Sequence, residues 1–97
     1  MAEIVFLPAA EGDYQEALDW YESRSTRAAA GFETAVEVAL ARVAKTPETW
    51  PFCDDRHRIY LLRRYPYSIV YRIEGNNVLI VAIAHNRRSE AYWNDRD

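Results

Sequence analysis

The chain has 97 residues, 49% of them hydrophobic, which predicts a single folded domain over residues 1–97 and excludes a disordered protein. Its longest apolar run, residues 78–84, is far shorter than the roughly 20 residues that cross a membrane, so no membrane span is expected. The N-terminus has no signal-like segment and Cys53 is the single cysteine, so we expect a cytoplasmic protein with a structural thiol.

The charge is spread unevenly along the chain. Residues 1–55 carry 11 acidic and 4 basic side chains, a net −7, and residues 56–97 carry 8 basic and 4 acidic, a net +4, which together give −3. Such asymmetry is typical of a protein with a basic face for an acidic partner. It is equally compatible with charges that lie on solvated faces and bind nothing.

An apolar run at residues 4–7 predicts a first short strand, which Pro8 ends because proline has no N–H to donate to a ladder. A helix is expected from Pro8 to about Ser23, since apolar residues recur there every three or four positions. One stripe should face the core: Ala10, Tyr14, Ala17, Leu18 and Tyr21. Four carboxylates occupy other positions, and we expect them on the solvated face rather than in a catalytic pair: Asp13, Glu16, Asp19 and Glu22.

A second helix should begin after Ser25 or Thr26, which are good N-cap residues, and should end before Pro47. Its apolar positions again form one stripe: Phe32, Ala35, Val36, Ala39, Leu40 and Val43. The short break between the two helices predicts an antiparallel helical hairpin. The loop at residues 46–55 should place Trp50 and Phe52 at the edge of the core.

Three strands are predicted in the second half, at residues 59–63, 67–73 and 78–84. A turn at Tyr65-Pro66 separates the first two, and the glycine and asparagines at residues 75–77 suit a tight hairpin between the last two. The last strand is apolar throughout and should be central. The order β-α-α-β-β-β predicts an α+β fold, with the helical hairpin packed on a mainly antiparallel four-stranded sheet.

No glycine-rich phosphate loop and no metal-ligand spacing is present, so neither a cofactor nor a metal is expected. The residues that remain for chemistry cluster at strand ends and in the tail: Arg63, Arg64, His85, Arg87, Arg88, Tyr92 and Trp93. Arginines bind phosphate, and a histidine or tyrosine can move a proton at a ribose hydroxyl, which together would suffice for metal-free RNA cleavage. The same groups would also suit docking on an acidic protein, or could simply be solvated or paired with Glu90 and Asp95.

The segment at residues 65–96 reads YPYSIVYRIEGNNVLIVAIAHNRRSEAYWNDR. It combines an aromatic-Pro-Tyr turn, a strand that ends in Tyr71-Arg72, a tight hairpin, an apolar strand, Ala-His-x-Arg-Arg at residues 84–88, and Tyr92-Trp93. This pattern strongly resembles the C-terminal half of RelE/ParE superfamily toxins, and the first half of the chain is similar as well. The resemblance implies the toxin of a type II toxin–antitoxin module, a class linked to growth inhibition and plasmid stabilisation. A cognate antitoxin would neutralise it in a heteromeric complex.

Members of the superfamily act on different targets. Some are ribosome-dependent mRNA endoribonucleases, and the resemblance would then make Arg64, His85, Arg88 and Tyr92 the catalytic residues. Others, the ParE-like ones, have no nuclease activity and poison DNA gyrase. Ser68 stands where the nucleases carry an arginine, and the sequence pI of about 5.4 is unfavourable for RNA binding, so a ParE-like, gyrase-directed toxin is favoured. An mRNA endoribonuclease and a non-toxic binding module of the same fold remain as alternatives.

Overall fold

The computed structural model of the protein describes residues 1–88 and 90–96, so Ser89 of the predicted functional tail and the predicted domain end at Asp97 lie outside the described residues. Its elements, in chain order, are β1 (Glu3–Phe6), α1 (Pro8–Glu22), α2 (Thr26–Lys45), β2 (Arg58–Leu61), β3 (Tyr67–Glu74), β4 (Asn77–His85) and the short 3₁₀ helix η1 (Glu90–Trp93). The predicted α+β class and element order are confirmed. Within the described residues, neither long helix is apolar enough to span a bilayer.

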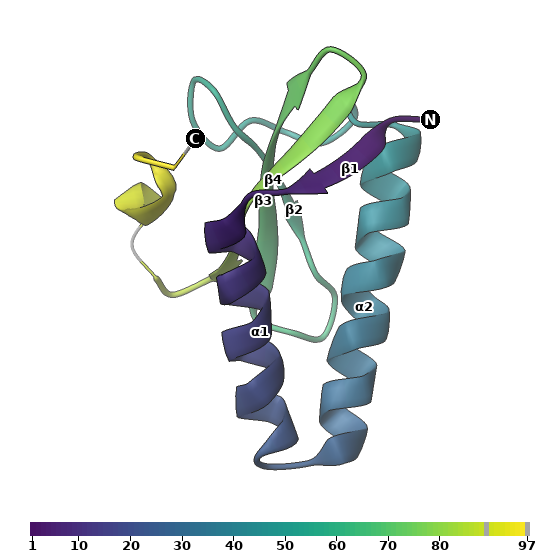
Figure 1. Ribbon diagram of the computed structural model, residues 1–97, viewed down its shortest axis with the longest axis vertical. Helices are drawn as coiled ribbons and strands as arrows, with labels where there is room; N and C mark the ends of the chain where they lie inside the picture. The colour runs from purple at the N-terminus through teal and green to yellow at the C-terminus, as the bar shows by residue number, and fades with distance from the viewer. Residues whose placement is uncertain (89, 97) are drawn as a thin grey trace.

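The sheet has the strand order β1-β4-β3-β2, so β4 is central, as its unbroken apolar run predicted. β3 pairs antiparallel with both β2 and β4, whereas β1 pairs parallel with β4 and places Ile4 opposite Val78. Gly75 has a φ of 60° at the first central position of the β3–β4 turn, which only glycine adopts freely. The α1–α2 connection lies at the opposite end of the molecule from this turn (Figure 1).

Both helices begin at the residues that the sequence predicted. Pro8 occupies the first turn of α1. Ser25 is the N-cap of α2, and its hydroxyl oxygen accepts a hydrogen bond from the N–H of Ala28 at 3.1 Å. The predicted helical hairpin is confirmed, and α2 ends at Lys45, before Pro47.

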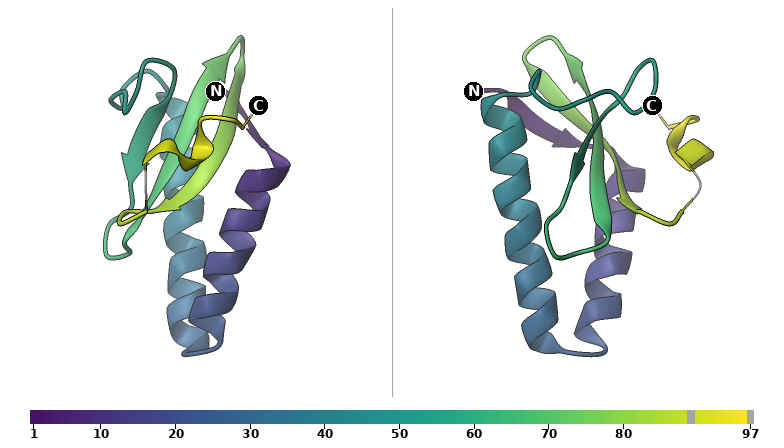
Figure 2. Two further views of the ribbon diagram at one scale, coloured as in Figure 1. Left: turned by 90° about the vertical axis from the view of Figure 1, so that its left-hand side faces the viewer. Right: turned by 180° about the vertical axis from the view of Figure 1, so that it is seen from behind.

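Two apolar clusters lie on opposite faces of the sheet. The larger one, between the sheet and the helical hairpin, contains the fully buried Phe32, Ile69, Tyr71 and Ile80. The smaller cluster, on the other face, consists of buried residues of β3 and β4 that pack with Trp93 of the tail: Val70, Val81, Ala82, Ala84 and Trp93. In Figure 1 and in the right-hand view of Figure 2, α2 and η1 lie on opposite sides of the sheet. The tail therefore covers the sheet face that the helices leave open.

The loop before β2 pairs with the outer edge of that strand. Ile59 donates its N–H to the carbonyl of Pro51 at 2.9 Å, and Phe52 forms an isolated bridge with Arg58. Trp50 packs against the main core as predicted, but the prediction for Phe52 was wrong, because its side chain is 59% exposed. The bridge turns Phe52 outward, where its ring lies 4.1 Å from the guanidinium of Arg58.

Gly31 in α2 lies directly under the hydroxyl of Tyr65, which overlaps the position that a Cβ would take. The Tyr65 ring is held edge-on by Tyr21 and Phe32, so it cannot swing aside easily. We therefore expect Gly31→Ala to lower the free energy of unfolding by about 1 kcal/mol, despite the better helix propensity of alanine. In a Tyr65→Phe background the clash is removed, and the same change should be neutral or stabilising. Urea unfolding of the four proteins tests this, and a destabilisation that persists without the hydroxyl would contradict it.

Candidate functional site

The four residues predicted for a nuclease site lie in two places. His85 ends β4, Arg88 follows it, and Tyr92 lies in η1, where its ring centroid is 4.1 Å from the Arg88 guanidinium. Arg64 lies in the β2–β3 turn and lines a different cleft, on the α2 side of the molecule. The structure thus brings His85, Arg88 and Tyr92 together and separates Arg64 from them.

His85 and Arg88 line a cleft of about 410 Å³ between α1 and the C-terminal end of β4, which we call the β4 cleft. Its wall is aromatic on the side of α1 and β3, with Trp20, Tyr21 and Tyr67. The His85 ring packs edge-on against Tyr67 at 5.1 Å, and its Nδ1 accepts a hydrogen bond from the N–H of Arg87 at 3.1 Å. In the neutral ring this bond leaves the proton on Nε2.

Two carboxylates from α1, Asp13 and Glu16, also line the β4 cleft. Glu16 is exposed, as predicted for this helix face, but the prediction was wrong for Asp13, whose side chain is only 11% exposed. The reason is the tail, which returns across the sheet and covers this position. A phosphate entering the β4 cleft would meet the carboxylate of Glu16 on one wall and Arg88 on the other.

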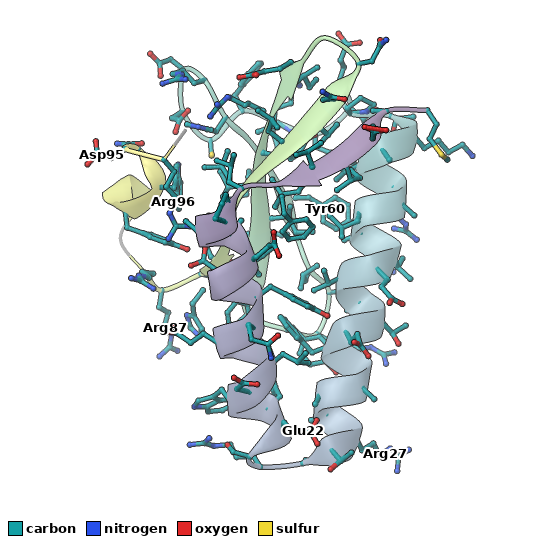
Figure 3. All side chains as sticks on the ribbon, in the orientation of Figure 1. Glu22, Arg27, Tyr60, Arg87, Asp95 and Arg96 are labelled. Carbon is teal, nitrogen blue, oxygen red and sulfur yellow. The ribbon has the colours of Figure 1, made fainter. Side chains whose placement is uncertain are left out.

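Asp13 joins α1, β4 and the tail. One of its oxygens accepts hydrogen bonds from the N–H of Ile83 at 3.1 Å, the hydroxyl of Tyr92 at 3.3 Å and the guanidinium of Arg96 at 2.6 Å. The second oxygen accepts another bond from Arg96 at 3.2 Å, so the ion pair is bidentate. Figure 3 shows the Arg96 side chain beside the first turns of α1. Asp13 and Arg96 lie 83 positions apart, and no local sequence pattern indicates that they form an ion pair. The sequence therefore did not predict this group.

The environment of Tyr92 makes its phenol a poor proton carrier. Burial, together with the negative charge of Asp13, raises the pKa of Tyr92 to about 12, so the hydroxyl stays protonated at neutral pH. Its hydroxyl donates its proton in a hydrogen bond to Asp13. Its ring lies between two guanidinium groups, those of Arg88 and of Arg96 at 4.8 Å. Tyr92 is therefore arranged as a structural contact of the tail.

Ser68, at the position where the nucleases of the superfamily carry an arginine, is buried in β3. Its hydroxyl donates to the side-chain oxygen of Asn86 at 2.5 Å. Ser68 therefore supplies no positive charge at this position of β3 to support Arg88. Among residues 1–88 and 90–96, no three histidine, cysteine or acidic side chains are grouped as metal ligands.

A second carboxylate, Asp54, holds the other side of the tail. It accepts hydrogen bonds from the indole N–H of Trp93 at 3.2 Å, from the N–H groups of Arg56 and His57, and contacts the buried His57 ring at 2.9 Å. Burial alone would raise the pKa of Asp54, but these hydrogen bonds outweigh it and lower the pKa from 3.8 to about 2. The sequence placed Asp54 in a loop and offered no sign of this role.

The lowered pKa of Asp54 predicts an acid-sensitive contribution to stability. The ionised carboxylate is favoured in the folded state, so it should contribute about 2 kcal/mol above pH 4, and this is lost as the pH falls from about 4 to 2. We expect Asp54→Asn to be destabilising at pH 7 and to approach the wild type near pH 2. Urea unfolding at pH 7, 4 and 2.5 tests this, with the exposed Asp55→Asn as control. A gap between wild type and Asp54→Asn that does not change with pH would contradict it.

Comparisons with known proteins identify the family. The family model described as the ParE toxin of the type II toxin–antitoxin system, parDE, matches residues 4–90. Among solved structures, a chain from the chromosomal ParDE TA system of P. aeruginosa is similar in fold, with a TM-score of 0.65 and 20% identity over 88% of this chain and 96% of that chain. No curated protein sequence matches the chain. The family match spans both helices, all four strands and the β4 cleft, and the chain belongs to the ParE toxin family of type II toxin–antitoxin systems.

Proposed function

We propose that this toxin arrests growth by acting on DNA gyrase without cleaving RNA, and that a cognate antitoxin binds and neutralises it. Both partners would meet it in the cytoplasm. Membership of the ParE toxin family supports the class of action.

One observation carries the choice against a nuclease: His85 and Arg88 share the β4 cleft with the carboxylates Asp13 and Glu16. RNA cleavage requires cations around the phosphate and a group that can exchange its proton near neutral pH. Here Arg64 lines another cleft, Ser68 supplies no charge, and Tyr92 keeps its proton. What the β4 cleft does offer is an aromatic wall with charges of both signs, which suits contact with a protein.

The test is a supercoiling assay with purified DNA gyrase and relaxed plasmid. We expect the chain to inhibit supercoiling or to trap a gyrase–DNA cleavage complex, and we expect prior incubation with the antitoxin to abolish the effect. Normal supercoiling with the chain in excess over gyrase, and no trapped complex, would refute the proposal.

One observation favours a second candidate, a metal-independent mRNA endoribonuclease. His85 and Arg88 line the same cleft, and a histidine beside a phosphate-binding arginine is a minimal arrangement for cleavage. In this case mRNA in a translating extract should be cut in the presence of EDTA, and the double substitution His85→Ala/Arg88→Ala should abolish cutting. Intact mRNA with the wild-type chain would exclude this candidate.

A further inference from the structure

Trp20 is the tryptophan that the folded core does not use. Trp93 is buried in the smaller apolar cluster and Trp50 packs against the larger one. Trp20, in contrast, is 50% exposed on α1, where it lines the β4 cleft. An indole left half in water contributes little to folding, whereas tryptophan is among the residues that most often dominate protein–protein contacts. Its exposure beside a cleft therefore indicates an interaction surface.

The Trp20 ring is held in place by its own helix. The guanidinium of Arg24, one turn further along α1, lies 3.8 Å from the ring centroid, and Tyr21 packs edge-on at 5.1 Å. Arg24 in turn donates to the carbonyl of Trp20 at 3.4 Å and to the hydroxyl of Ser23 at 3.1 Å. A side chain that is already ordered loses little entropy on binding, so Trp20 is suited to anchor a partner.

Three arginines surround this tryptophan and the β4 cleft. Arg88 lines the cleft, and Arg24 stacks on its Trp20 wall. The backbone N–H of Arg87 donates to His85, which also lines the cleft, and Figure 3 shows the Arg87 side chain at the outer surface of the protein. All three arginines are exposed, and none forms an ion pair with a carboxylate among the residues that the structure describes. We call this surface the Trp20 face: Trp20, Arg24, His85, Arg87 and Arg88.

The carboxylates nearby do not neutralise the Trp20 face. Of the two that line the β4 cleft, Asp13 is already paired with Arg96, which leaves Glu16. Further along α1, Asp19 and Glu22 accept hydrogen bonds from neighbouring side chains and do not line the cleft. Three arginines against one carboxylate leave this face positively charged, in a chain whose net charge is −3.

An acidic protein surface fits the Trp20 face better than DNA does. Glu16 and the exposed carboxylates of α1 would repel the regularly spaced phosphates of a duplex. A protein, in contrast, presents carboxylates only where guanidinium groups meet them, and places an apolar side chain against the aromatic wall. The β4 cleft, with a volume of about 410 Å³ and Trp20 and Tyr67 in its wall, is of a size that accepts such a side chain.

We propose that the Trp20 face is the surface that binds gyrase, a proposal that rests on the proposed function. A bulky apolar side chain from an acidic segment of gyrase packs in the β4 cleft against Trp20 and Tyr67. Carboxylates of the same segment pair with Arg24, Arg87 and Arg88. Charge complementarity and the ordered aromatic wall select this partner. Arg88, a residue of the predicted nuclease site, then serves to recognise a protein.

The first test measures the affinity of the purified chain for purified gyrase without DNA, by calorimetry at 0.15 M salt. We expect Trp20→Ala to weaken binding about 30-fold, because it removes the anchor of the contact. Alanine suits an exposed helix position, so this variant should keep the thermal midpoint of the wild type. The matched control is Phe52→Ala, which removes another exposed aromatic ring that stacks on an arginine, Arg58, and should bind gyrase as the wild type does.

A second variant tests the charges of the Trp20 face. Arg87→Glu/Arg88→Glu should weaken gyrase binding by about 10-fold or more, because it replaces two attractions with repulsions. The control Arg42→Glu/Arg63→Glu changes the net charge equally at exposed sites in the cleft on the α2 side, and should weaken binding far less. Raising the salt to 0.5 M should weaken binding of the wild type more than that of Arg87→Glu/Arg88→Glu.

The outcomes separate this inference from the proposed function. Equal gyrase affinities for Trp20→Ala and Phe52→Ala would overturn the inference and leave the proposed function intact. The same holds if the wild type binds gyrase only when DNA is present and Arg87→Glu/Arg88→Glu abolishes that binding, because the face would then contact nucleic acid. A wild-type chain that neither binds gyrase nor inhibits supercoiling would overturn the proposed function, and the inference with it.

Discussion

Replacing Phe32 by alanine is expected to lower the free energy of unfolding by about 4 kcal/mol, the largest stability effect of any change considered for this protein. Phe32 is fully buried where the helical hairpin meets the sheet. Its ring is packed by four tyrosine rings with centroids 5.1 to 5.8 Å away: Tyr14, Tyr21, Tyr65 and Tyr67. Alanine would leave a cavity among rigid rings that cannot collapse into it. Urea unfolding measures the loss.

The matched control for this substitution is Phe52→Ala. It removes the same side chain from a position that is 59% exposed, where the ring contacts the guanidinium of Arg58. We expect a loss of less than about 1 kcal/mol. Similar losses for the two variants would contradict the assignment of Phe32 to the centre of the core.

Asp13→Ala is expected to cost about 3 kcal/mol and to release the tail from the sheet. The change leaves the partly buried Arg96 guanidinium without its bidentate partner, and it leaves the N–H of Ile83 and the hydroxyl of Tyr92 without an acceptor. Amide hydrogen exchange should show faster exchange in residues 90–96 and at Ile83, while the amides of α2 keep their protection.

Asp19→Ala provides the matched control for Asp13→Ala on the same helix. Asp19 is exposed and its carboxylate accepts a hydrogen bond from the side chain of Gln15 at 2.8 Å, so its loss should cost less than about 0.5 kcal/mol. If Asp13→Ala were as mild as Asp19→Ala, the ion pair with Arg96 would not hold the tail.

The helices and strands were predictable because their apolar patterns depend only on residues that are close together in the sequence. The stripes on α1 and α2 and the alternation in β3 report which face meets the core, and Pro8 and Ser25 mark helix starts through the chemistry of the first turn. The central place of β4 followed from a run that is apolar on both faces.

The contacts that decide the candidate site were not predictable, because they join distant segments. Asp13 differs from Asp19 in that it meets the N–H of Ile83 in β4 and the tail folds over it, and no local pattern encodes the return of Arg96. Arg64 and His85 both lie near strand ends, yet Arg64 lines a cleft beside α2 and His85 lines a cleft beside α1, so nearness to an edge did not place them in one cleft. The Asp54 contact with Trp93 likewise bridges 39 positions.

The central claim is that the chain acts on gyrase and leaves RNA intact, and one experiment addresses both halves of it. The chain is induced in cells that carry a reporter plasmid, and plasmid topology and mRNA integrity are measured in the same samples before growth stops. We predict relaxed plasmid topoisomers and full-length mRNA. Normally supercoiled plasmid together with cleaved mRNA would contradict the claim.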